Sequence, residues 1–481
     1  MHRNGGSAYL CTTGQCAPHP DRARHRRNEK DVSDPGQTLN LSCGHEWYRP
    51  YGDHPGVTVV PGPLPLSPSP HRRGVPRLGV LCALLLAAGG GAHADTLDTS
   101  ALHWNAFGTL GAVYQNSRGL AFRRDLGQGR GARAGEVDFG TDSVLGAQLT
   151  GHTDFGLSAE VQGVMRRDAT GRWRPRLSRA FLRYEPSPAW MLRAGRIGLS
   201  IYLLGDALDV GYAYLTVRPP PEVYGILANA DFDGADVTYS RALGAALIRL
   251  RAFGGQIPFR FATANGGVID FSNNNMFGLS ADYLDGDWET RLAVVRLSQR
   301  SAAPFTGLAA GLEATAVPQA VLLAGSLLRT PQNTYAVEAG TNYTGRHLRA
   351  TAVLVRFDSP NPVGPNENTG YVLLGWQVKD VTPFAVFSVA ENFGQARPTG
   401  LPPLSVFAPL IAGAAQAQTF FQTTQRDLAL GARYDFAPHM DFKVQLDHVW
   451  LAHSALIFDA NVPPPNRDSM TVASLAVDFA F

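Results

Sequence analysis

The sequence predicts an all-β protein: a transmembrane, antiparallel, up-and-down β-barrel of about sixteen strands over residues 95–481. Three observations lead to this fold class. Apolar and polar residues alternate with a period of two along many stretches, as in strands that have one apolar face. Short polar turns alternate with longer irregular segments, which is typical of hairpins that cross a membrane. The last alternating stretch runs to the terminal residue, Phe481.

The composition is that of a folded chain without long apolar helices. Hydrophobic residues make up 44% and aromatic residues 10% of the 481 residues, which excludes a disordered chain. The mean hydropathy is −0.09. One apolar run, from Leu78 to about Ala92, approaches the length that spans a membrane. The rest is therefore soluble or a barrel, in which alternation masks the hydropathy. Charges after Asp95 nearly balance, which gives no support to nucleic-acid binding.

The cysteines do not indicate a metal or a disulfide in the predicted barrel. All four (Cys11, Cys16, Cys43 and Cys82) precede Asp95. The first three, taken with a nearby histidine, match no reliable metal-ligand spacing. We predict no metal, no cofactor and no catalytic residue for this chain.

Three features in order predict a secretory signal peptide over residues 75–94. A basic region ends at Arg77, an apolar core runs from Leu78 to Ala88, and the small residues Ala92 and Ala94 flank His93. This order is typical of a signal peptide, and it predicts cleavage between Ala94 and Asp95. The mature barrel domain is then residues 95–481.

Residues 1–74 do not fit that arrangement. They are rich in Pro, Gly, His and Arg without periodicity, and a signal peptide belongs at the N-terminus. We therefore interpret residues 1–74 as a disordered, non-native extension from a mis-assigned gene start. Translation would begin at Val75 on an alternative codon.

Alternation and connections together predict the strand number. Short turns are expected near Asp154, Pro186, Leu243, Asp285, Thr344, Asp380 and Pro438. Longer segments lie between them, at about 117–135, 166–176, 200–232, 254–272, 299–332, 357–368, 390–424 and 452–469. These fifteen connections imply sixteen strands, an even number, as bacterial barrels require. The segments 299–332 and 390–424 are long enough to hide further strands.

Aromatic residues and the last strand support a membrane barrel. The outward positions near strand ends are rich in Trp and Tyr, which prefer membrane interfaces; they include Trp104, Tyr114, Tyr184, Trp190, Tyr239, Trp288 and Tyr343. The last strand places Ala473, Leu475, Val477, Phe479 and Phe481 on one face. Terminal Phe481 resembles the signal that the outer-membrane barrel assembly machinery reads.

Four motifs in order resemble the general porins and porin-like outer-membrane proteins of Gram-negative proteobacteria. They are Gly195-Arg196 after the strand Trp190–Ala194, the segment Pro219–Gly225, the segment Gly431–Phe436, and Phe481. The resemblance covers essentially all of residues 95–481. It implies a trimeric water-filled channel for small hydrophilic solutes, embedded in outer-membrane lipids and lipopolysaccharide. It also implies that the third long loop, 200–232, folds into the barrel and narrows it.

Charged residues near that loop are candidates for a pore constriction. The acidic groups of the loop are Asp206, Asp209 and Glu222. Basic residues at inward positions on nearby strands are Arg179, Arg183, Arg193, Arg196, Arg249 and Arg251. An arginine facing lipid at mid-membrane would cost about 2–4 kcal/mol, so these side chains should point inward. They either line the pore, where they would create a transverse field with the acids, or anchor the loop by ion pairs.

Two other functions stay open at this stage. An outer-membrane barrel enzyme, such as a lipid hydrolase, would need a Ser–His pair at one barrel rim. The histidines are scattered, with no nucleophile motif beside them; they are His103, His152, His347, His439, His448 and His453. A soluble secreted β-protein that binds carbohydrate would show alternation too, but the terminal Phe481 and the pattern of connection lengths argue against it.

Overall fold

The computed structural model describes residues 102–226, 231–263, 266–271, 274–457 and 468–481. The predicted extension (1–74), signal peptide (75–94) and cleavage site at Ala94 and Asp95 lie outside the described residues.

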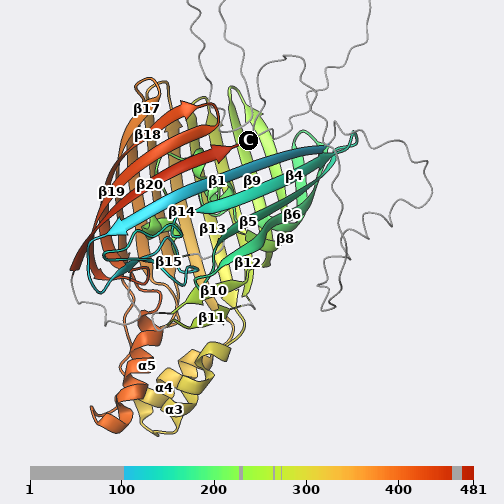
Figure 1. The fold of residues 1–481 in the computed structure, drawn as a ribbon. Coiled ribbons are helices and arrows are strands. Elements are labelled where there is room, and N and C mark those ends of the chain that lie inside the picture. Colours follow the sequence, from blue (N-terminus) through green and yellow to red (C-terminus); the bar gives the residue numbers. More distant parts are fainter. Residues whose placement is uncertain (1–101, 227–230, 264–265, 272–273, 458–467) are drawn as a thin grey trace, which may run out of the picture. The chain divides into compact units, whose positions relative to one another are not determined.

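Within these residues, sixteen antiparallel strands form one closed barrel, which confirms the predicted fold class (Figure 1). Each strand pairs with the next in the chain, and β1 closes the barrel by pairing with β20. The strands are β1 (Leu102–Gln115), β4 (Val144–His152), β5 (Leu157–Arg167), β6 (Trp173–Ser187), β7 (Trp190–Gly198), β8 (Asp231–Leu243), β9 (Ala246–Gln256), β12 (Asn274–Asp285), β13 (Trp288–Gln299), β14 (Gln332–Thr344), β15 (Leu348–Asp358), β16 (Glu367–Trp376), β17 (Val381–Asn392), β18 (Thr424–Ala437), β19 (Met440–His453) and β20 (Asp468–Ala480).

The two faces of the barrel wall differ in chemistry. In the β12–β13 pair, Leu279 lies opposite Val294, and both side chains are exposed on the outer face. One residue further along, Ser280 lies opposite Ala293, and both are buried on the inner face. Successive side chains of a strand point to opposite faces, so the period-two pattern sends leucine and valine outward and polar groups inward.

Aromatic side chains gather at the ends of the strands on the outer face. Trp190 packs on Tyr239 with ring centroids 4.9 Å apart, and Trp288 packs on Tyr343 at 4.7 Å. Both pairs lie where the short turns join the strands. Tyr114 of β1 and Tyr335 of β14 are exposed at the other end of the barrel, where the long connections join the strands. The expected interfacial positions are therefore occupied at both rims.

The connections alternate between two ends of the barrel. Short turns of two to four residues join β4–β5, β6–β7, β8–β9, β12–β13, β14–β15, β16–β17 and β18–β19. Gly244 and Gly286 take φ of +63° and +54° in two of these turns, a conformation that glycine adopts without strain. We call this the short-turn end and the other the long-loop end.

Several predicted loops differ from the structure. The first, expected at 117–135, extends over 116–143, because β4 begins only at Val144. The expected loop 166–176 is only residues 168–172, because β5 and β6 continue further than predicted. The segments 299–332 and 390–424 hold helices rather than hidden strands. These are α3 (Thr306–Glu313), α4 (Pro318–Leu328) and α5 (Ala408–Thr419). Figure 1 shows them together beyond the long-loop end of the barrel. No helix in the described part of the chain is long and apolar enough to cross a membrane.

Two small hairpins also lie in the long connections. One pairs β2 (Ala121–Phe122) with β3 (Ala132–Arg133), and the other pairs β10 (Phe259–Ala262) with β11 (Val268–Phe271).

Candidate functional site

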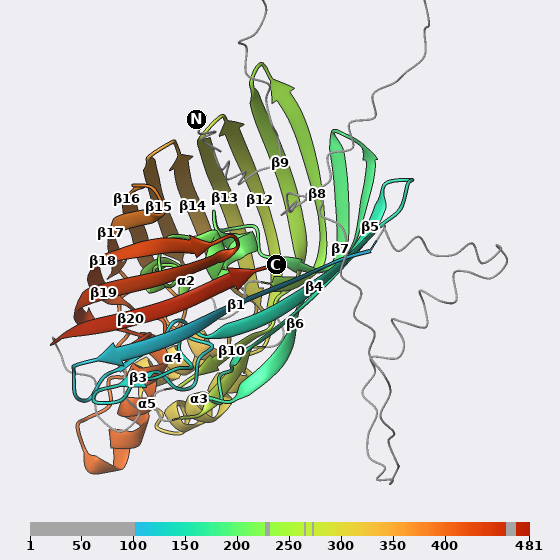
Figure 2. The same ribbon diagram turned by 45° about the horizontal axis from the view of Figure 1, so that its top comes forward.

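The third long connection, described over 199–226, crosses the interior of the barrel. The Tyr202 carbonyl accepts a hydrogen bond from Arg291 of β13 (2.6 Å), and the Leu203 N–H donates to Glu338 of β14 (2.7 Å). Further along, the Val217 N–H donates to Gln445 of β19 (2.8 Å). Figure 2 shows the helix of this connection, α2 (Pro221–Tyr224), within the ring of strands. We call residues 199–226 the inner loop.

Local sequence explains how the inner loop fits this space. Pro221 occupies the first turn of α2, where its missing N–H costs no hydrogen bond. Gly211 lies against the wall, because a Cβ there would come within 2.0 Å of Asp478 Oδ1 and 2.2 Å of Thr109 Oγ1. Lys443 Nζ donates to the Gly211 carbonyl (2.8 Å), which holds the loop at this close approach.

The apolar middle of the inner loop packs inside the barrel. The Tyr224 ring lies 5.0 Å from Tyr202 and 6.0 Å from Tyr371 of β16. Val217 and Val223 are buried as well. Apolar residues between Leu203 and Val217 are therefore compatible with an inward course, because they form a small core against the barrel wall.

Asp206 and Asp209 lie beside arginines of the N-terminal half of the barrel. Arg179 of β6 donates to the Asp206 carbonyl oxygen. Burial opposes ionisation of Asp206, but Arg179 and its neighbouring arginines outweigh it and hold the pKa of this carboxyl well below its usual range. Asp209 lies 3.3 Å from Arg176 and 3.8 Å from Arg166. Its pKa is also lowered, since these cations outweigh its burial.

Glu222 lies elsewhere. Its two carboxylate oxygens accept hydrogen bonds from Ser388 of β17 (2.8 Å) and Gln425 of β18 (2.6 Å). Burial raises the pKa of Glu222, although these two donors oppose the shift. The three predicted loop acids thus occupy two different parts of the interior. Asp206 lies beside the predicted Arg179, whereas Asp209 pairs with Arg166 and Arg176, which were not predicted.

Most of the six predicted arginines bind acids on the barrel wall rather than the inner loop. Arg193 lies 2.5 Å from Asp236, Arg196 lies 2.7 Å from Asp233, and Arg183 lies 2.5 Å from Glu185. Arg249 lies 3.9 Å from Asp282. The other two contact the loop: Arg179 donates to the Asp206 carbonyl, and Arg251 donates to the Ser200 hydroxyl. Among these six, two therefore attach the loop and four form pairs within the wall.

The strongest attachment of the inner loop was not predicted. Arg218 lies 2.7 Å from Asp142, in the first long connection, and 3.3 Å from Asp447 of β19. Its guanidinium also lies over the Phe122 ring, 4.7 Å from the centroid. Burial would lower the pKa of Arg218, but Asp142 outweighs it and raises the pKa above the ordinary value. Asp447 occupies an inward position of an alternating strand, so the sequence pattern could have placed its side chain inside the barrel.

A second cluster anchors the loop near β20. Lys443 lies 2.9 Å from Asp478, and both side chains are fully buried. Arg433 lies 3.1 Å from Asp441 and donates to the Tyr212 carbonyl (2.8 Å). These residues alternate with outward leucines and valines in the sequence, but nothing in the pattern indicates which charges pair.

The opposite wall carries carboxylates that lack cationic partners. Among the described residues, one oxygen each of Glu338, Glu367 and Asp427 is buried without a hydrogen bond, as is the Tyr202 hydroxyl. No arginine or lysine of the described chain lies within 4.0 Å of Glu338 or Glu367. These three carboxyl groups lie on β14, β16 and β18, whereas ion pairs with arginine or lysine occupy the strands on both sides of them, β6 to β13 and β18 to β20.

The described residues contain no group of three or more His, Cys, Asp or Glu placed to hold a metal ion. His448 Nδ1 lies 2.9 Å from the Thr471 hydroxyl, but this pair is on the outer face, where the His448 ring contacts Trp450.

Comparisons with known proteins found matches among solved structures. No protein-family model matches the sequence, and no curated protein sequence matches it significantly. Among solved structures, a loop L8 deletion mutant of the outer membrane protein OmpT of Vibrio cholerae is 12% identical, with 79% of this chain and 100% of that chain covered and a TM-score of 0.45. OmpF of Salmonella typhi in complex with daunomycin is 10% identical, with 79% and 97% covered and a TM-score of 0.47. A mutant porin of Rh. blastica is 13% identical, with 79% and 100% covered and a TM-score of 0.41. Likeness at this level says nothing about activity.

Proposed function

We propose that this chain forms a water-filled channel in the outer membrane of a Gram-negative bacterium, through which small hydrophilic solutes and ions diffuse passively. One observation carries the proposal: a closed barrel of sixteen strands, apolar outside and charged inside. Barrels of about 16–18 strands are wide enough to leave an aqueous passage, whereas eight-stranded barrels are filled by side chains.

The outer face supports a location in a membrane. Leucine, valine and phenylalanine side chains are exposed along the strands, among them Leu110 (68%), Leu354 (68%) and Phe277 (58%). A closed barrel satisfies all backbone hydrogen bonds between strands, which lipid requires of any segment that crosses it. The long-loop end would then face the exterior and the short-turn end the periplasm.

The inner loop is the proposed constriction. It attaches to both halves of the barrel wall, through Arg179 on one side and Glu222 on the other. The charged and polar groups that line the remaining passage would favour hydrated polar solutes over apolar ones of the same size.

The resemblance to general porins adds partners to this proposal. The outer face would contact membrane lipids and lipopolysaccharide, the chain would form a homotrimer, and Phe481 would be read by the barrel assembly machinery. The Phe481 N–H donates to the Ala106 carbonyl (2.7 Å), and its side chain is exposed on the wall. An exposed terminal aromatic side chain would be accessible to the assembly machinery before the barrel closes.

Planar-bilayer recording tests the channel. Purified, refolded protein should produce discrete conductance steps, and the reversal potential in asymmetric salt should report its ion preference. The same preparation, heat-denatured before addition, is the control. Absence of steps from protein that migrates as folded would overturn the proposal. Cell fractionation tests the location, since recovery in the soluble periplasm would contradict a membrane barrel.

A further inference from the structure

Arg123, in the first long connection, is buried (2% exposed) and binds main-chain carbonyls of three connections. Its Nε donates to the Leu456 carbonyl (3.0 Å) and its Nη2 to the Ala455 carbonyl (2.6 Å), both in the last long connection. Nη1 donates to the Gln128 carbonyl of its own connection (3.0 Å) and to the Ala262 carbonyl of the β10–β11 hairpin (3.4 Å). A guanidinium carries five N–H groups in a rigid plane, so one side chain can hold all three connections together.

These connections rest on the end of the inner loop. The Leu126 N–H donates to the Gly225 carbonyl (2.9 Å), and the Leu126 carbonyl accepts from the Ala262 N–H (2.9 Å). The approach to Gly225 is close, because a Cβ there would come within 2.9 Å of Leu456 Cδ2 and 3.1 Å of the Arg124 carbonyl oxygen. The contact lies directly after α2, in the proposed constriction. We call residues 123–128, 262 and 455–457 the mouth cluster.

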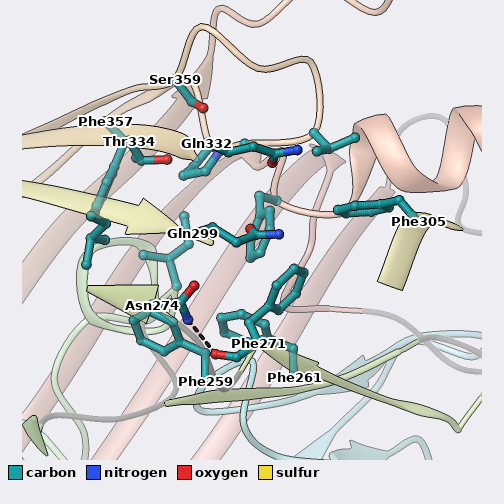
Figure 3. A pocket seen from close by; sticks show the side chains of 16 residues that line it. Phe259, Phe261, Phe271, Asn274, Gln299, Phe305, Gln332, Thr334, Phe357 and Ser359 are labelled. Carbon is teal, nitrogen blue, oxygen red and sulfur yellow. Dashed lines mark hydrogen bonds between the residues drawn. The ribbon is translucent and has the colours of Figure 1, made fainter. Parts of the chain in front are cut away.

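The β10–β11 hairpin attaches the mouth cluster to the barrel wall. Figure 3 shows Phe259, Phe261 and Phe271 of this hairpin close together. The Phe261 ring lies 5.4 Å from Phe259, 5.8 Å from Phe271 and 5.2 Å from Phe421, which precedes β18. Asn274 of β12 donates to the Phe271 carbonyl. The hairpin is therefore held by two parts of the barrel, and Arg123 joins the first and last connections to it.

We propose that Arg123 is a positioning residue that limits the size of the solutes that enter the channel. The inference rests on the proposed function and adds to it a residue that does not line the passage. Leu126 and Leu456 are buried in one apolar cluster with Val223 and Tyr224 of the inner loop, so this part of the cross-section is closed while the mouth cluster stays in place. Without the guanidinium, carbonyls in an apolar surrounding lose their donor, which favours separation of the connections until water reaches them.

Arg123→Met tests the proposal, and Arg130→Met is the matched control. Arg130 belongs to the same connection, but it forms an exposed pair with Glu136 (51% and 57%). Single-channel conductance in the presence of polyethylene glycols of increasing size measures the size limit. Arg123→Met should conduct more than the wild type and admit larger polyethylene glycols, whereas Arg130→Met should match the wild type. Arg123→Lys should fall between them, because an ammonium keeps the charge but lacks the planar fork of donors.

Amide hydrogen exchange of the full-length protein in detergent provides a readout that needs no conductance. Peptides that contain Leu126 or Ala262 should exchange about tenfold faster in Arg123→Met, as expected when hydrogen bonds from a charged donor are lost. Peptides from β12 and β13 should keep the wild-type rate, which shows that the barrel is folded.

The proposal is overturned if folded, conducting Arg123→Met keeps the wild-type size limit, or if the Leu126 and Ala262 peptides exchange as in the wild type. Either result leaves the channel itself intact. Absence of channel steps from the wild type would instead overturn the proposed function, and the size limit with it.

Discussion

The guanidinium of Arg218 and the carboxylate of Asp142 lie 2.7 Å apart, with side chains only 1% and 0% exposed. One belongs to the inner loop and the other to the first long connection. Asp447 of β19 also lies 3.3 Å from this guanidinium. Arg218 therefore ties the inner loop both to the wall and to a second connection.

Replacing Arg218 by methionine should destabilise the folded barrel. The substitution leaves the buried carboxylate of Asp142 without its cation, which typically costs about 3–5 kcal/mol. Urea unfolding of protein in lipid vesicles measures this loss. Arg426→Met is the matched control, since Arg426 and Glu391 form an exposed pair (63% and 57%). Such a pair contributes about 0–1 kcal/mol. Equal losses in the two variants would contradict the anchoring role.

Arg249 and Arg193 should respond differently to neutralisation. Arg249 lies 3.9 Å from Asp282, which keeps Arg291 at 2.6 Å when Arg249 is replaced. Arg249→Gln should therefore shift the reversal potential towards cations and change the unfolding free energy by less than about 1 kcal/mol. Arg193→Gln should cost about 3–5 kcal/mol, because it leaves the buried Asp236 without its cation at 2.5 Å. An unchanged reversal potential in Arg249→Gln would remove Arg249 from the pore lining.

The loop acids should give pH dependences of opposite sign. The pKa of Glu222 is higher in the folded protein than in the unfolded chain. Protonated Glu222 therefore stabilises the fold at a pH below the unfolded pKa, and this stabilisation is lost as the pH rises through the folded pKa. The pKa of Asp206 is lowered, so its contribution is present above the unfolded pKa and is lost as the pH falls through the folded pKa. We expect Glu222→Gln to gain stability relative to the wild type as the pH rises from about 4.5, the ordinary pKa of a glutamate.

Asp206→Asn is the counterpart of that experiment. It should be less stable than the wild type at neutral pH, and the difference should shrink as the solution is acidified below about pH 4. Urea midpoints measured across the pH range for the three proteins show both trends. Parallel curves for wild type and Glu222→Gln would contradict the assigned burial of Glu222.

Phe481→Ala should separate assembly from stability. The Phe481 side chain is 53% exposed and stacks on Phe479 at 5.8 Å, so its loss should cost about 1 kcal/mol in refolded protein. In cells, the amount of protein in the outer membrane should fall several-fold if the barrel assembly machinery reads this residue. Leu475→Ala, an exposed position on the same strand, is the control. Equal amounts of both variants in the membrane would show that Phe481 is not a signal.

Local patterns predicted the barrel because strand geometry is local. The alternation around Leu279 and Ser280 follows from the pleat of one strand, and the turns near Gly244 and Gly286 follow from the conformations that glycine allows. The inward positions of the arginines also followed from a local argument, the cost of a charge in lipid. Together these were sufficient for the strand number and for the faces of the wall.

The arrangement of the interior could not be predicted in the same way. Thr109 and Asp478 are hydrogen-bonded although 369 residues separate them, and Arg218 meets Asp447 across 229 residues. Inward charges are interchangeable in a binary pattern, so the sequence does not indicate which of them pair. The separation of Glu222 from Asp206 depends on the path of the inner loop. The helices α3, α4 and α5 lie in segments where neither periodicity nor a membrane boundary gave a signal.

The seam between β1 and β20 joins the first described strand to the last, with Phe107 opposite Ala480 and Gln115 opposite Val472. Every other neighbouring pair of strands can form as soon as its hairpin exists, but this pair must wait for the whole chain. A chain that is cut short anywhere before β20 keeps two open sheet edges, which invite pairing with other chains. The seam therefore makes completeness of the polypeptide a condition of closure, and a ribosome that stops early yields an aggregation-prone sheet rather than a smaller barrel.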